Sequence, residues 1–176
     1  NDFVFLESLP ERERRNGIIE AIKVAAIRDR EFFEYIEAHA DELARLEQRV
    51  LERVVQRSAE LHVEHIAGGG DPFEMGSARP LDFCHWAAHK LEQVSGFRVA
   101  HGEAVAIGMA VDLIYSAKKG IVPAETAERI IRLIEKIGFA TYAPELLGES
   151  SNGELVILAG LEEFREHLGG TLAITL

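Results

Sequence analysis

Cysteine is almost absent from this chain, since Cys84 is the only one among its 176 residues. A single cysteine excludes a disulfide within the chain and agrees with a reducing cytoplasm. It also excludes a zinc site closed by several thiolates, which is a common structural type. A metal in this protein is therefore expected to bind histidine nitrogens and carboxylate oxygens.

The sequence also lacks long uncharged apolar runs and an excess of basic residues. Charged side chains interrupt every hydrophobic segment before the roughly 18 residues that a membrane helix needs. Asp and Glu number 30 against 19 Lys and Arg, which gives a net charge of −11, whereas nucleic-acid binding requires a positive surface. We therefore expect a soluble cytoplasmic domain without a membrane or nucleic-acid partner. The first residues contain neither an initiator Met nor a signal peptide, which favours a piece of a longer protein.

Three of the seven histidines lie within seventeen positions. His85 and His89 are four residues apart, so on a helix both imidazoles project from the same face. His101 begins a second apolar helical stretch, which is able to pack against this face and bring His101 close to the other two histidines. The spacing predicts a catalytic type of metal site, in which three protein ligands leave a position for water or a substrate oxygen. It does not say which residue completes the ligand set.

The apolar residues recur mostly with a helical period. They predict a helix over residues 11–28, a second one from Asp29, and a long charged one from 41 to about 66. A glycine-rich break at residues 68–72 separates these from the histidine helix, which is expected to start near Arg79 or Asp82.

Two more helices are expected after Gly96 closes the histidine helix. One is an apolar core helix over residues 104–119, in which Gly108 allows close helix contact. The other starts at Pro123 and ends at Gly138. The remainder is mixed, and residues 172–176 have strand composition. The fold class is thus mainly α, with a short β segment near the C-terminus.

Three blocks of sequence occur in order within residues 1–120, namely 15–23 (RNGIIEAIK), 71–92, and 101–109 (HGEAVAIGM). Together they resemble the sugar-phosphate cyclases, the superfamily of 3-dehydroquinate synthase. The resemblance implies that residues 1–176 form the helical C-terminal metal- and substrate-binding domain of that fold. It also implies that the N-terminal nicotinamide-binding domain is absent from this chain, which would then be inactive alone.

The resemblance implies a metal ligand set of Glu20, His85 and His101. One carboxylate and two neutral imidazoles suit zinc or cobalt and leave an open position, which agrees with this assignment. Lys23, one turn from Glu20, matches a lysine that contacts substrate and serves catalysis. His89 matches a histidine that sits by the substrate phosphate and assists proton transfer.

The reaction implied by the resemblance uses NAD without net redox change. A ring hydroxyl of a phosphorylated sugar is oxidised, phosphate is eliminated, the ketone is reduced again, and an aldol step closes a carbocycle. The transient oxidation acidifies the neighbouring C–H bond, so that phosphate is able to leave.

Substrate-binding positions depart from the pattern of 3-dehydroquinate synthase. Ala78 stands for an arginine, Asp82 for an asparagine, and Glu64 for the lysine that helps with the substrate carboxylate. This pattern is more similar to 2-epi-5-epi-valiolone synthase, which closes sedoheptulose 7-phosphate, because added carboxylates suit hydroxyl donors. The predicted substrate-binding residues are thus Lys23, Glu64, Arg79 and Asp82. Arg79 lies one position from the family arginine, which keeps a true 3-dehydroquinate synthase as the alternative.

Two further departures flank the predicted ligand His85. Cys84 replaces a glycine, which leaves three outcomes open: its thiol shifts His85, it is accommodated because cysteine is small and polarizable, or it competes as a metal ligand. Trp86 replaces a small hydroxyl residue. Glu103 has two interpretations, as a charge at a helix N-terminus or as a hydrogen-bond partner of a ligand histidine.

Other protein classes remain compatible with these patterns. Metal-dependent alcohol and glycerol dehydrogenases share the overall arrangement and would accumulate reduced nicotinamide. A non-catalytic helical module would bind a metal or a partner through its acidic helices. The resemblance also suggests a possible homodimer.

Overall fold

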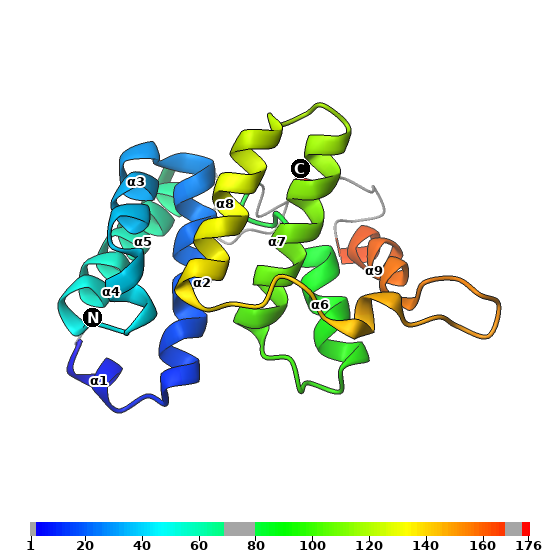
Figure 1. Cartoon of the computed structure of the whole chain (residues 1–176), viewed down its shortest axis with the longest axis horizontal. Helices are drawn as coiled ribbons and strands as arrows, with labels where there is room; N and C mark the ends of the chain where they lie inside the picture. Colours follow the sequence, from blue (N-terminus) through cyan, green and yellow to red (C-terminus); the bar gives the residue numbers. More distant parts are fainter. Residues whose placement is uncertain (1–2, 69–79, 168–173) are drawn as a thin grey trace.

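The computed structural model describes residues 3–68, 80–167 and 174–176. These residues form α-helices and two short 3-10 helices, and the predicted mainly α fold is confirmed (Figure 1). The helices are α1 (Val4–Glu7), α2 (Glu11–Arg28), α3 (Arg30–Ala38), α4 (Ala40–Ala44), α5 (Gln48–Gly68), α6 (His85–Val94), α7 (His101–Lys118), α8 (Ala124–Ile137), η1 (Pro144–Leu147), η2 (Val156–Leu158) and α9 (Ala159–His167).

Several helices begin and end where the sequence predicts. α2 spans residues 11–28 as expected, and Asp29 then begins the next helix because its side chain accepts a hydrogen bond from the Phe32 N–H at 2.9 Å. α8 begins after Pro123 and ends at Gly138, whose φ of 104° is the left-handed conformation that glycine favours.

The predicted single helix from 41 to 66 is wrong, since α4 ends at Ala44 and α5 begins at Gln48. Leu46 breaks the run with a φ of 58°, and its side chain is buried with only 7% exposed. Burial of this leucine in the core offsets the cost of a left-handed conformation that helical periodicity does not reveal.

The histidine helix begins later than predicted, at His85 rather than near Arg79 or Asp82. Cys84 has a φ of 66° and therefore cannot continue a right-handed helix. Arg79 lies outside the described residues. Similarly, residues 174–176 are the only described part of the expected β segment, and they have no regular secondary structure.

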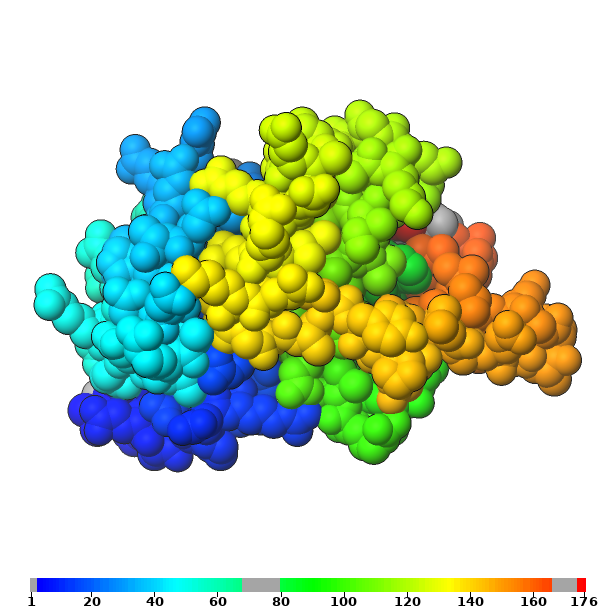
Figure 2. Space-filling view, in the orientation of Figure 1, coloured from blue at the N-terminus to red at the C-terminus, as the bar shows by residue number. Residues whose placement is uncertain are grey.

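α2 lies in the middle of the molecule, with α3, α4 and α5 on one side and α6, α7 and α9 on the other (Figure 1). Its isoleucines Ile18, Ile19 and Ile22 are fully buried and form one core with Met109 of α7 and Ile134 of α8. The exposed segment that follows η1, coloured orange, projects from this body at the right-hand edge (Figure 2).

Two glycines of α7 let this helix lie directly against its neighbours. A Cβ atom at Gly102 would lie 2.7 Å from the carbonyl oxygen of Asn16 in α2, and one at Gly108 would lie 2.8 Å from that of Cys84. The prediction that Gly108 permits a close contact is confirmed, although the contact is with the turn before α6. These approaches bring the first turn of α7 beside α2 and the start of α6.

None of the helices formed by the described residues is both long enough and apolar enough to cross a bilayer.

Candidate metal centre

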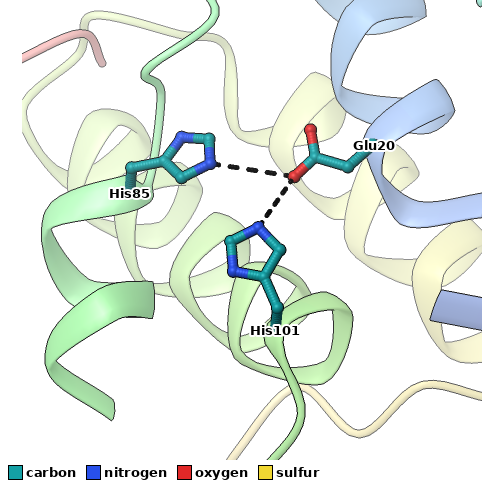
Figure 3. A group of neighbouring side chains, drawn as sticks. All are labelled: Glu20, His85 and His101. Carbon is teal, nitrogen blue, oxygen red and sulfur yellow. Dashed lines mark ion pairs between the residues drawn. The ribbon is translucent and has the colours of Figure 1, made fainter. Parts of the chain in front are cut away.

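Glu20 of α2, His85 of α6 and His101 of α7 meet at one point, although 81 positions separate the first from the last (Figure 3). Glu20 Oε1 lies 3.7 Å from His85 Nε2 and 3.5 Å from His101 Nε2. Each residue offers one ligand atom, and these three atoms lie within 4.8 Å of one another. The structure thus brings together the three side chains predicted as metal ligands.

The donor set and its spacing fit a divalent cation such as zinc. Glu20 Oε1 is buried and has no hydrogen-bond partner among the described residues. Two ligand atoms about 2.1 Å from a tetrahedral zinc ion stand about 3.4 Å apart, which is close to the separations seen here. The side chains of His85 and His101 are 17% and 46% exposed, so the centre is open to solvent on the His101 side.

Lys23 lies beneath the centre and is 2% exposed. Its ammonium group is 2.7 Å from Glu20 Oε2 and 3.4 Å from His85 Nδ1. A buried ammonium group needs such a partner, and the pair leaves Oε1 of Glu20 directed at the two imidazoles. Lys23 therefore orients Glu20 and contributes a fixed positive charge to the site.

The three ligand candidates have displaced pKa values. Burial acts to raise the pKa of Glu20, but its interactions with His101 and Lys23 lower it to about 2. Burial and the Lys23 charge lower the pKa of His85 to about 4, whereas interactions with Glu20 and Glu92 raise that of His101 to about 9. At neutral pH the imidazole of His85 is thus neutral, and His101 carries the proton that a metal would displace.

Glu92 is a member of the site that the sequence analysis missed. Its Oε2 lies 3.0 Å from His101 Nδ1, on the side of the ring away from Glu20. A carboxylate in this place fixes the tautomer that presents Nε2 to a metal. Its spacing was a usable signal, because residues 85, 89 and 92 lie on one face of a helix.

Glu103 has the first of its two predicted roles. Its carboxylate accepts a hydrogen bond from the Ala100 N–H at 2.9 Å, at the start of α7, and forms an ion pair of 2.6 Å with Arg12. The carboxylate that contacts Nδ1 of His101 is that of Glu92 instead.

His89 lies next to the three ligand candidates on the open side. Its ring centroid is 5.1 Å from that of His85 and 5.7 Å from that of His101. It also forms a second cluster with Glu92 and His101, in which the possible ligand atoms again lie within 4.8 Å. His89 therefore adjoins the three ligand candidates and belongs to a second group of possible ligands that shares His101 with the first.

The predicted substrate-binding residues are not all at the centre. Asp82 lies in the turn before α6, where its Oδ1 accepts a hydrogen bond from the Thr175 hydroxyl at 2.8 Å. Its Oδ2 is buried and has no hydrogen-bond partner in the part of the chain that is described. Glu64 is exposed on α5, 3.6 Å from Arg57, and belongs to neither cluster around the centre.

Cys84 does not join the ligand atoms, since it is absent from both clusters found in the described residues. It is fully buried, and burial raises the pKa of its thiol well above the usual value. A thiol that stays protonated is a poor zinc ligand.

Comparisons with known proteins identify the family of this chain. Residues 17–154 match the family model described as 3-dehydroquinate synthase C-terminal. The 2-epi-valiolone synthase of Actinosynnema mirum is 35% identical over 172 residues, which are 97% of this chain and 44% of that protein. The 3-dehydroquinate synthase of Symbiobacterium thermophilum is 39% identical over 145 residues, which are 82% of this chain and 40% of that protein.

A solved structure has the same fold. ValA, the 2-epi-5-epi-valiolone synthase of Streptomyces hygroscopicus subsp. jinggangensis, was determined with NAD+ and Zn2+ bound. It matches with a TM-score of 0.80 and 25% identity, over 98% of this chain and 46% of that one. The chain thus spans less than half the length of these relatives. It belongs to the 3-dehydroquinate synthase family, in which it matches the C-terminal part.

Proposed function

We propose that this chain is the metal- and substrate-binding part of an NAD- and zinc-dependent sugar-phosphate cyclase. The convergence of Glu20, His85 and His101 from three helices is the observation that carries the proposal. The names of the relatives support the reaction class, and the NAD+ and Zn2+ in ValA support the cofactors. The proposal places the nicotinamide-binding part outside these 176 residues, so the chain alone is inactive.

The three ligands would hold the cation by one carboxylate oxygen and two Nε2 atoms. A zinc ion bound there would polarise a substrate hydroxyl as a Lewis acid, and NAD+ would accept and return the hydride. The protein supplies the geometry: Lys23 holds Glu20 through Oε2, and Glu92 holds His101 through Nδ1.

Two residues that adjoin the ligand candidates, the buried Lys23 and the exposed His89, are proposed to act on the substrate. The ammonium group of Lys23, which faces the His85 ring, would contact a substrate oxygen. His89 lies on the exposed side of α6, where an imidazole suits proton transfer when phosphate leaves. Histidine is suited to this role because its ordinary pKa lies near neutrality.

We propose sedoheptulose 7-phosphate as the substrate, with the 3-dehydroquinate synthase reaction as the alternative. The unpaired Oδ2 of Asp82 supports the first choice, because a carboxylate accepts hydrogen bonds from hydroxyl groups and repels another carboxylate. Arg79 and Glu64 keep their proposed roles in substrate binding, although Glu64 is paired with Arg57 here. The number of subunits in the enzyme stays a prediction.

Zinc binding tests the metal part of the proposal in this chain. We expect one zinc per chain, and we expect Glu20→Gln, His85→Ala and His101→Ala each to lower zinc affinity by at least about 100-fold. His62→Ala is the control, because His62 is exposed on α5 and belongs to neither cluster. Unchanged zinc content in all three ligand variants would refute the site.

Activity assays of the enzyme that contains this chain and its nicotinamide-binding part test the reaction. Phosphate release from sedoheptulose 7-phosphate, without accumulation of reduced nicotinamide, is the expected result. Release only from the 3-dehydroquinate synthase substrate would favour the alternative. Net formation of reduced nicotinamide from a simple alcohol would instead identify a dehydrogenase.

A further inference from the structure

A buried carboxylate near the start of α6 belongs to neither cluster of possible metal ligands among the described residues. Asp112 of α7 is 2% exposed. The indole Nε1–H of Trp86 donates to its two carboxylate oxygens at 3.0 and 3.3 Å. The backbone N–H of Cys84 donates a further hydrogen bond to it. Asp112 therefore binds the residue before His85 and the residue after it.

The turn that Asp112 contacts has a conformation that a cysteine does not prefer. Cys84 has φ 66° and ψ −7°, the left-handed region in which a Cβ atom is crowded. Its carbonyl group receives the Ala88 N–H at 3.1 Å, so this turn sets the start of α6 and the direction in which His85 leaves it. The turn needs external support, because a non-glycine residue there is strained.

α7 provides that support with two residues four positions apart on one face. Gly108 lets the helix approach the Cys84 carbonyl and Cβ, and Asp112 receives the Cys84 N–H and the Trp86 indole. A carboxylate suits this place because it accepts hydrogen bonds from both donors. Burial raises the pKa of Asp112 to about 7, and the two hydrogen bonds oppose this rise.

We propose that Asp112 is a positioning residue for the metal centre: it fixes the Cys84 turn and the Trp86 ring, and thereby directs the His85 imidazole at Glu20 and His101. Asp112 touches neither the metal nor the substrate in this account. The inference rests on the proposed metal site and adds to it the buried support of one ligand.

Zinc affinity measured by competition with a chromophoric chelator tests this role in the 176-residue chain. We expect Asp112→Asn to weaken zinc binding about 10- to 100-fold, as loss of a residue that orients a ligand does. Trp86→Phe keeps an aromatic ring and loses the indole N–H donor, while the Cys84 N–H contact remains, so it should cause a smaller loss. Asp41→Asn is the control, since Asp41 is exposed and pairs with Lys136 away from the centre.

A rescue separates positioning from general loss of stability. Glycine adopts the left-handed region readily, so Cys84→Gly should restore most of the zinc affinity that Asp112→Asn removes. The visible spectrum of bound Co2+, which reports coordination geometry, should change in Asp112→Asn and return in the double variant. Folding of each variant is checked by circular dichroism.

Three results would overturn the inference. The first is an unchanged zinc affinity in folded Asp112→Asn, and the second is a loss of affinity in that variant that Cys84→Gly does not relieve. The third applies if Asp112→Asn does not fold: Trp86→Phe then has both an unchanged zinc affinity and an unchanged Co2+ spectrum. Glu20→Gln is measured beside them. If that variant also binds zinc normally, the metal site itself is wrong; if it alone loses zinc, only the role of Asp112 is wrong.

Discussion

His101 is held between two carboxylates, with Nδ1 3.0 Å from Glu92 Oε2 and Nε2 3.5 Å from Glu20 Oε1. Only the second of these contacts faces the other ligand candidate, His85. The first fixes the plane and tautomer of the ring, so that Nε2 is available to a metal. Of the two carboxylates, Glu20 is therefore placed to share a metal with His101, and Glu92 is placed to orient the His101 ring.

Replacing Glu92 tests this division of roles. We expect Glu92→Gln to lower zinc affinity about tenfold and Glu92→Ala to lower it further, because an orienting hydrogen bond is weakened and then lost. Isothermal titration calorimetry with zinc measures the effect. Glu103→Gln is the matched control, since Glu103 contacts Arg12 and the Ala100 N–H. Equal losses of zinc affinity in Glu92→Gln and Glu103→Gln would contradict the orienting role of Glu92.

Zinc binding should release about one proton at pH 7. The pKa of His101 is raised to about 9 and that of His85 is lowered to about 4, so only His101 must lose a proton to become a ligand. Apparent zinc affinity should therefore rise about tenfold per pH unit between pH 6 and 8. Calorimetry in buffers of different ionisation enthalpy counts the protons. A pH-independent affinity over this range would exclude His101 as a ligand.

The Cys84 turn should tolerate glycine better than alanine. We expect the free energy of unfolding of Cys84→Gly to exceed that of Cys84→Ala by about 1 kcal/mol, because both variants lose the buried thiol and only glycine is free of the left-handed strain at φ 66°. Cys84→Ala keeps that strain and loses the thiol, so it should be no more stable than the original chain. Urea unfolding of the three proteins measures this. A glycine variant less stable than the alanine variant would show that the turn is not strained.

Asp112 should make the protein less stable as the pH rises. Its pKa is raised to about 7, above the usual value, so its contribution is fully present below about pH 4 and is lost as the pH rises through 7. Between pH 5 and 8 the free energy of unfolding of the original chain should therefore fall relative to that of Asp112→Asn. A constant difference would contradict the raised pKa.

Much of the fold and the choice of the three ligand candidates could be predicted from the sequence, because their signals are local. Pro123 and Gly138 bound α8 as expected, and the ligand assignment depended on short motifs around Glu20, His85 and His101. Each of these features depends on residues within one or two helical turns.

Other features depend on long-range packing and could not be predicted. Leu46 and Cys84 take left-handed conformations that tertiary contacts stabilise, and they displaced two predicted helix boundaries. Glu92 and Asp112 act on residues from other segments, so their roles require the three-dimensional arrangement. The resemblance that predicts a substrate-binding role for Glu64 likewise gives no sign that its carboxylate is paired with Arg57.

The most direct test of the central claim is a crystal structure of the zinc-loaded protein with anomalous diffraction measured at the zinc edge. We predict a single anomalous peak bonded to Glu20, His85 Nε2 and His101 Nε2 at about 2.0–2.2 Å, with one further oxygen ligand. A peak bonded to the Cys84 sulfur, or one that lacks any of the three predicted ligands, would contradict the account.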